Sequence, residues 1–117
     1  MNLFICYSKC STCKKAENFL KNNGIEYELR DIKIDNPKKE ELRKYVILSG
    51  KDIKCFFNTS GLVYRSLNLK GKLNNMSYEE KLDILSSDGM LVKRPILVTE
   101  NKVYVGFDEK QWSNLIK

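Results

Sequence analysis

Near the N-terminus, residues 3–31 read LFICYSKCSTCKKAENFLKNNGIEYELRD. The run from Leu3 to Tyr7 is continuously apolar or aromatic, which is typical of a short strand buried on both faces. Ala16, Phe19 and Leu20 then recur at helical spacing, and Gly24 can adopt the left-handed conformation that ends a helix. These residues predict a strand, a loop that carries two cysteines, and a helix.

The next segment, from Ile25 to Asp31, alternates apolar and polar side chains, which predicts a second strand. Two strands separated by one short helix are most simply the parallel strands of a βαβ unit.

The middle of the chain, from about residue 37 to residue 90, reads as helical. Asn36, followed by a proline, is predicted to cap one helix, which Gly50 ends. Ser77 and Glu80 have the spacing of a capping box at the start of another helix, which Gly89 closes. Between them we expect a short helix around residues 52–57, then a loop and a weak helical turn. A segment this long is predicted to form a helical layer beside the sheet.

The C-terminal part predicts a hairpin and a last helix. Residues 96–99 and 103–107 are strand-like runs around a three-residue turn. Asp108 is predicted to cap a helix that turns Trp112, Leu115 and Ile116 inward. The order β-α-β, helices, β-β-α therefore predicts one α/β domain over residues 1–117.

Composition limits the classes of protein that fit. A chain of 117 residues with 42% hydrophobic residues is long enough for one compact domain. It contains neither an apolar run of membrane-spanning length nor the pattern of an export signal, so we expect a soluble cytoplasmic protein without membrane contact. Cytosolic thiols are kept reduced, and the four cysteines are therefore not expected to form a structural disulfide framework.

The formal charge of +6 is unevenly distributed, because residues 53–77 contain no Asp or Glu. The basic side chains of this stretch are Lys54, Arg65, Lys70 and Lys72. A solvated basic face is the simplest interpretation, and an acidic protein, an anion or nucleic acid is the alternative.

Cys10 and Cys13 form a C-x-x-C pair at the predicted strand-to-helix turn. Cys10 lies just before the helix, where unpaired N–H groups, the helix dipole and nearby lysines favour a thiolate, so it is the candidate nucleophile. Cys13 lies one helical turn later and can displace a product from Cys10 by forming a disulfide, which makes it the candidate resolving thiol. The pattern favours a redox pair over metal ligands or inert buried thiols.

A zinc site is the weaker interpretation of the cysteines. The chain has no histidine, so Cys6 and Cys55 would have to complete the four ligands. Cys6 lies in a buried strand that points poorly for this purpose. We therefore expect no metal, and we expect Cys6 and Cys55 to pack in the core.

Arg94 precedes a proline at the start of the first hairpin strand. An arginine after a helix usually faces water. If this strand pairs with the cysteine strand, however, the guanidinium of Arg94 projects near Cys10, where it can hold a thiolate, an oxyanion or a carboxylate.

Three segments, YSKCSTCKKAENFL, SDGMLVKRPILV and VYVGFDE, resemble the arsenate reductase (ArsC) family of glutaredoxin-like proteins, in particular its Spx-type branch with C-x-x-C. The resemblance covers the whole chain in order. It implies a thioredoxin-like fold with an inserted helical subdomain, a cis-proline at Pro95, Cys10 as nucleophile and Arg94 as oxyanion ligand. Ser11, Thr12, Arg65 and Pro95 are the expected substrate-binding residues.

The chain departs from the reductases of this family, which hold arsenate with three arginines. By the resemblance, two of these three arginines are absent from this chain. One of their positions falls on or near Gly61, with Arg65 one turn later, and the other falls near Gly106. The resemblance implies glutathione, glutaredoxin or thioredoxin as reductant and partner, and no permanently bound cofactor.

Spx regulators instead bind the C-terminal domain of the RNA polymerase α subunit and use the cysteine pair as an oxidation switch. The segment LSGKDIKC resembles their contact region and puts Gly50 in the place of its glycine, although a glycine here is also an ordinary helix end. The sequence has no helix-turn-helix or zinc finger, so direct nucleic-acid binding is not expected. A thiol–disulfide or arsenate-type reductase is the preferred function, and a redox-sensing regulator is the alternative.

Overall fold

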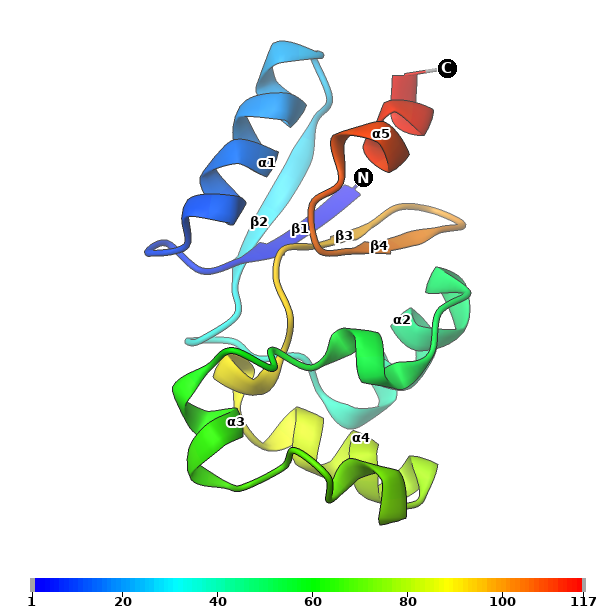
Figure 1. Ribbon diagram of the computed structural model, residues 1–117. Coiled ribbons are helices and arrows are strands. Elements are labelled where there is room, and N and C mark those ends of the chain that lie inside the picture. The colour runs from blue at the N-terminus through cyan, green and yellow to red at the C-terminus, as the bar shows by residue number, and fades with distance from the viewer. Residues whose placement is uncertain (1, 117) are drawn as a thin grey trace.

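The computed structural model, which describes residues 2–116, contains a four-stranded sheet in the order β2-β1-β3-β4 (Figure 1). Strands β1 and β2 pair in parallel, joined by helix α1, and the hairpin of β3 and β4 pairs antiparallel to β1. The bounds are Asn2–Cys6 for β1, Ser11–Asn22 for α1, Tyr27–Asp31 for β2, Ile96–Val98 for β3 and Val103–Val105 for β4. The predicted βαβ unit and hairpin are confirmed.

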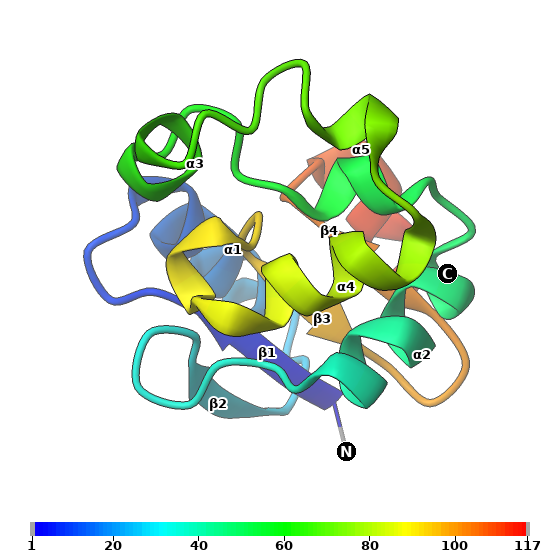
Figure 2. The same ribbon diagram turned by 90° about the horizontal axis from the view of Figure 1, so that it is seen from below.

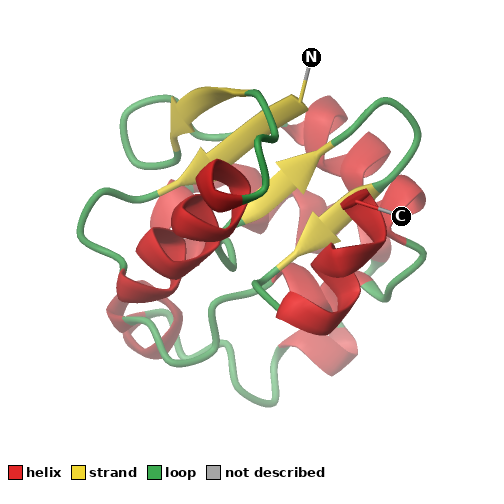
Figure 3. Ribbon diagram, turned by 90° about the horizontal axis from the view of Figure 1, so that it is seen from above, coloured by secondary structure: helices red, strands yellow, loops and turns green. Residues whose placement is uncertain are grey.

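The two faces of the sheet are covered by different helices. Helix α1 and the C-terminal helix α5 (Glu109–Trp112) lie over one face (Figure 3), and the helical middle of the chain lies against the other (Figure 2). Because side chains alternate along a strand, Phe4 of β1 packs under α1 and α5, while Ile5 packs against the helical middle. Both side chains are fully buried, which confirms the prediction of a strand buried on both faces.

The helical segment between β2 and β3 is the predicted insertion. Its α-helices are α2 (Lys39–Ser49), α3 (Leu62–Ser66) and α4 (Tyr78–Ser87), and its 3-10 turns are η1 (Ile53–Phe56), η2 (Leu73–Asn75) and η3 (Gly89–Leu91). Together with the sheet they form the mixed α/β fold that the sequence predicts. None of the helices within residues 2–116 is long and apolar enough to cross a membrane.

Two predicted helix ends in the insertion are wrong. Helix α2 is capped by Lys38, whose backbone N–H donates to Glu41, whereas the side chain of Asn36 donates to the backbone carbonyl of Ser86 at the end of α4. Helix α4 ends at Ser87, and Gly89 starts η3 instead of closing the helix.

The glycine at position 89 has a packing role, because a Cβ there would lie 1.9 Å from the carbonyl oxygen of Ile32. The insertion thus presses directly on the backbone that follows β2. A bidentate ion pair between Arg30 of β2 and Glu41 of α2, with N–O distances of 2.7 and 2.9 Å, joins the same two parts.

The predicted caps of two helices are confirmed. Ser77 and Glu80 form the capping box of α4, with distances of 2.9 and 3.1 Å, and the carboxylate of Asp108 accepts backbone N–H groups of α5. Helix α5 is short and continues as a 3-10 turn, η4 (Ser113–Ile116). That tighter turn leaves Ile116 53% exposed, so the prediction that it faces inward is wrong.

The side chain of Trp112 is fully buried on the face of the sheet that α1 and α5 cover. Its indole donates to the backbone carbonyl of Gly106, and its ring lies at the centre of an aromatic cluster. The neighbouring rings, with centroids 5.0 to 6.4 Å away, are those of Phe4, Phe19, Tyr104 and Phe107.

Candidate functional site

Cys10 is the N-cap residue of α1, in the loop that leaves β1. Its sulfur accepts the backbone N–H of Cys13 at 3.4 Å, and its side chain is half-buried. The first N–H groups of a helix lack partners within the helix and carry the positive end of its dipole, so this position stabilises a thiolate.

Cys13 is buried behind Cys10, at 3% exposure. Its sulfur accepts the backbone N–H of Tyr7 at 3.4 Å, and its side chain packs in the same cluster as Cys6 and Cys10. The hydrogen bond to Cys6 and burial raise the pKa of the Cys13 thiol well above its usual range. Cys13 is therefore a thiol that holds its proton at neutral pH.

The other two cysteines differ from one another. Cys6 is buried in β1 as predicted, and the hydrogen bond from Cys13 lowers the pKa of its thiol. Cys55 is exposed, so the prediction that it packs in the core is wrong: η1 turns Ile53 and Phe56 inward and leaves Cys55 outside. Among residues 2–116, no group of three or more Cys, Asp or Glu side chains is arranged to hold a metal ion.

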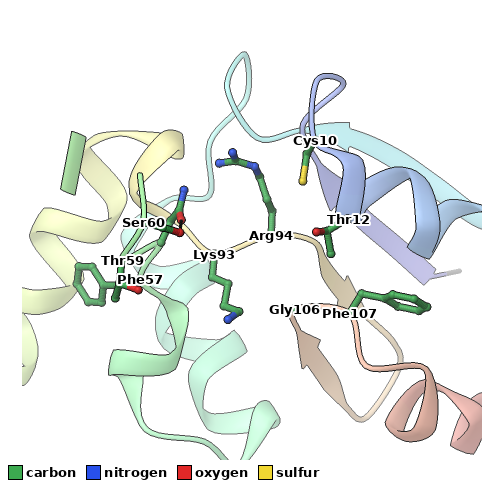
Figure 4. Close-up of a pocket in the computed structure, with 10 residues that line it drawn as sticks. Cys10, Thr12, Phe57, Thr59, Ser60, Lys93, Arg94, Gly106 and Phe107 are labelled. Carbon is green, nitrogen blue, oxygen red and sulfur yellow. Dashed lines mark hydrogen bonds between the residues drawn. The ribbon is translucent and has the colours of Figure 1, made fainter. Parts of the chain in front are cut away.

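Cys10 opens into a pocket of about 310 Å³ between the two parts of the fold (Figure 4). One wall comes from the start of α1, another from the loop before α3 in the insertion, and the floor from the segments that flank β3 and β4. The lining residues are Cys10, Thr12, Phe57, Asn58, Thr59, Ser60, Lys93, Arg94, Gly106 and Phe107.

Arg94 extends from the segment before β3 into this pocket, as the pairing of β3 with β1 predicts (Figure 4). Its Nε and Nη1 atoms are buried, and no residue between 2 and 116 accepts a hydrogen bond from them. The guanidinium lies 5.1 Å from the centroid of the Tyr7 ring, which holds it by a cation–π contact. Two buried nitrogen atoms whose N–H groups have no acceptor, on a residue that lines the same pocket as Cys10, can receive an anion.

Lys93 is a second cation at the pocket. Gly106, with φ of +74°, leaves the space through which the Lys93 side chain passes: a Cβ at position 106 would lie 2.9 Å from Lys93 Cε. Thus the position where the resemblance places an arginine in the reductases is occupied, in space, by the aliphatic part of a lysine from the neighbouring segment.

The structure brings together some of the predicted site residues and separates others. Thr12 lines the pocket. Pro95 follows Arg94 through a cis peptide bond; it is buried and is outside the lining. Ser11 is exposed and outside the lining. Arg65 is also exposed and outside it, because its Nη2 donates to the carbonyl of Ser60 at 2.6 Å. Gly50 ends α2 in the left-handed conformation, away from the pocket.

Sequence reasoning missed several residues of this region. Asn58, Thr59 and Ser60 are ordinary polar loop residues, and only the folded insertion carries them to the pocket. Lys93 was detectable as the neighbour of Arg94. The contact of Cys6 with Cys13 follows from a strand and a helix that share one face of the sheet, so Cys6 belongs with the C-x-x-C pair.

Comparison with known proteins identifies relatives over the whole fold. YusI of Bacillus subtilis, an uncharacterized protein, is 50% identical over 109 residues, which cover 93% of this chain and 92% of YusI. The regulatory protein MgsR of the same species is 30% identical over 114 residues, 97% of this chain and 89% of MgsR. The global transcriptional regulator Spx of Enterococcus faecalis is 26% identical over 102 residues, 87% of this chain and 76% of Spx.

Solved structures also resemble this chain over nearly its whole length. An ArsC family related protein from Bacteroides fragilis superposes with a TM-score of 0.96 at 50% identity, over 97% of this chain and 96% of its own. A possible arsenate reductase from Streptococcus mutans gives a TM-score of 0.90 at 42% identity, over 100% and 98%. The model of the ArsC family matches residues 6–115, so the chain belongs to the ArsC family and has its thioredoxin-like fold.

Proposed function

We propose that this protein is a thiol–disulfide oxidoreductase that uses Cys10 as nucleophile and Cys13 as resolving thiol. The observation that carries the proposal is that Cys10, whose sulfur caps α1, lines the same pocket as Arg94, whose buried Nε and Nη1 atoms have no hydrogen-bond partner. Cys13 lies directly behind it, shielded from solvent.

With a disulfide substrate, the Cys10 thiolate attacks one sulfur and displaces the other as a thiolate, leaving a mixed disulfide. Cys13 then loses its proton and attacks Cys10, which forms the Cys10–Cys13 disulfide and releases the second thiol of the substrate. Two electrons pass from the protein to the substrate. A dithiol or two molecules of a thiol, such as thioredoxin, glutaredoxin or glutathione, then restore the reduced pair.

An oxyanion such as arsenate can react with the same two thiols. The Cys10 thiolate adds to the arsenic(V) centre with loss of water, and attack of Cys13 on Cys10 releases arsenic(III) and leaves the disulfide. Arg94, with Lys93 nearby, supplies the positive charge for either an oxyanion or an anionic disulfide. No bound cofactor is needed for these steps.

The test is a trapping experiment with Cys13→Ser in a Cys55→Ser background, which removes the exposed thiol. Without the resolving thiol, Cys10 should accumulate as a mixed disulfide with its substrate or reductant, released by dithiothreitol and identified by mass spectrometry. Cys10→Ser is the matched control and should trap nothing, because serine keeps the helix cap but lacks the sulfur. Equal trapping by both variants, or no turnover of any disulfide or arsenate by the parent protein, would rule the proposal out.

A second candidate is a redox-sensing regulator that binds the RNA polymerase α subunit, favoured by the relatives named MgsR and Spx and by the surface at the end of α2. There Gly50 has φ of +69° and open space around its Cα, next to the 70% exposed side chain of Ile47. Binding of the α subunit to reduced and oxidised protein tests it. Gly50→Asn should abolish the contact, whereas Gly24→Asn, at an equally open glycine with φ of +67°, should not.

A further inference from the structure

A second cleft, of about 200 Å³, lies on the other side of the cysteine loop. Its lining includes Cys6 and Cys13, together with the charged side chains of Lys14, Glu17 and Asp31. Cys10 lines the first pocket and is absent from this lining, and Cys13 lines only the second cleft. Of the three cysteines in the N-terminal segment, one therefore lines the first pocket and the other two line the second cleft.

The order of the sulfurs follows from the local fold. Cys6 is the last residue of β1, and its side chain points to the same face as that of Phe4, toward α1. Cys13 is in the first turn of α1 and faces inward, where it packs in one buried cluster with Cys6, and its backbone N–H donates to the sulfur of Cys10. Cys13 is thus the middle member of a chain of three thiols.

We propose that Cys6 is a third redox thiol, which takes over the disulfide from Cys10. This inference rests on the proposed function, because it begins with the Cys10–Cys13 disulfide. The Cys6 thiolate attacks the sulfur of Cys13, the Cys6–Cys13 bond forms, and the Cys10–Cys13 bond breaks with Cys10 leaving as a thiolate. No electrons enter or leave in this step, and the proton of Cys6 goes to solvent in the cleft.

The geometry favours this exchange. Cys6 and Cys13 pack in the same buried cluster and line the same cleft, so the two side chains are already neighbours. The leaving thiolate of Cys10 remains at the N-terminus of α1, the position that stabilises it. The result is a free Cys10 in the substrate pocket and a disulfide between two residues that line the second cleft.

Tryptic mapping distinguishes the two disulfides, because Lys9 and Lys14 flank the C-x-x-C pair. A Cys10–Cys13 disulfide stays within peptide 10–14, whereas a Cys6–Cys13 disulfide joins that peptide to peptide 1–9. The full chain carrying Cys55→Ser is oxidised with one equivalent of diamide, blocked with N-ethylmaleimide at low pH, and digested. We expect both products, with Cys10 alkylated in the joined peptides.

Two variants complete the experiment. In Cys10→Ser, diamide should still join the two peptides through Cys13, and in Cys6→Ala the oxidised protein should contain only the internal disulfide. Alkylation of Cys10 in oxidised protein should therefore fall at least tenfold between parent and Cys6→Ala.

The inference is overturned if the oxidised parent contains only the internal disulfide and Cys10→Ser keeps both thiols free, or if the joined peptides are linked through Cys10. In that case the proposed function stands, since Cys10 and Cys13 still form their disulfide. A parent that forms neither disulfide and turns over no substrate overturns both proposals.

Discussion

Replacing Arg94 by methionine should make the protein more stable and its active site less reactive. The reason is the burial of Nε and Nη1 without acceptors, which costs free energy in the protein alone and becomes favourable only when an anion accepts from them. Methionine can fill the space of the Arg94 side chain with an unbranched side chain that has no N–H group.

The magnitude follows from the contacts. An unsatisfied buried N–H costs about 1–3 kcal/mol, and the cation–π contact of Arg94 with Tyr7 returns about 1 kcal/mol. Arg94→Met should therefore raise the free energy of unfolding by up to about 2 kcal/mol. Losing charge-assisted hydrogen bonds to a bound anion, worth about 1.5–3 kcal/mol, should slow reaction with an anionic substrate about 10- to 150-fold.

The assay uses Cys55→Ser protein, so that Cys10 is the reporting thiol. Urea unfolding gives the stability, and stopped-flow absorbance gives the rate with the dianionic 5,5′-dithiobis(2-nitrobenzoate) and with the uncharged 2,2′-dithiodipyridine. Only the first rate should fall in Arg94→Met. Arg65→Met is the control, because that exposed side chain lies outside the pocket and should alter neither quantity. If Arg94→Met is destabilised by more than about 1 kcal/mol and reacts with both disulfides at the parent rate, the side chain is structural and our reasoning is wrong.

Three further predictions concern other parts of the fold. Because burial and a thiol hydrogen bond raise the pKa of Cys13, release of its partner from Cys10 should accelerate about tenfold between pH 7 and 8 in single-turnover quench experiments; a flat profile would contradict this. Glu41, whose pKa Arg30 lowers to about 2, should stabilise the protein fully above about pH 4.3 and progressively less as the pH falls toward 2. Glu41→Gln should therefore cost about 1–2 kcal/mol in urea unfolding at pH 7, discounted for partial exposure, and flatten the acid limb of the stability curve. Gly89→Ala, whose Cβ would lie 1.9 Å from Ile32 O, should cost about 3 kcal/mol, and a loss below about 0.5 kcal/mol would show that the backbone yields there.

The elements that the sequence predicts well are those defined by local interactions. The capping box of Ser77 and Glu80, the cap of Asp108 and the C-x-x-C turn each involve residues within four positions of one another. Cys10 and Arg94 could be brought together only by reasoning about strand pairing, which requires the parallel βαβ unit and the hairpin to share β1.

Two of the wrong predictions concern residues whose partners are distant along the chain. Asn36 bonds to Ser86, fifty positions away, and Gly89 is required by the backbone of Ile32. In both cases the residue type is also common at helix ends, so local reasoning gave a plausible but incorrect role. The pocket wall at residues 58–60 has no sequence signal, because the insertion positions it.

Trp112 gives the protein an internal optical probe. It is the only tryptophan of the chain, its ring is fully buried, and it packs at 5.0 Å from Phe107, which lines the Cys10 pocket. Any ligand or disulfide that displaces Phe107 changes the surroundings of a single emitting indole. Occupancy of the site can therefore be followed by intrinsic fluorescence in unlabelled protein, with no dye that would itself consume a cysteine.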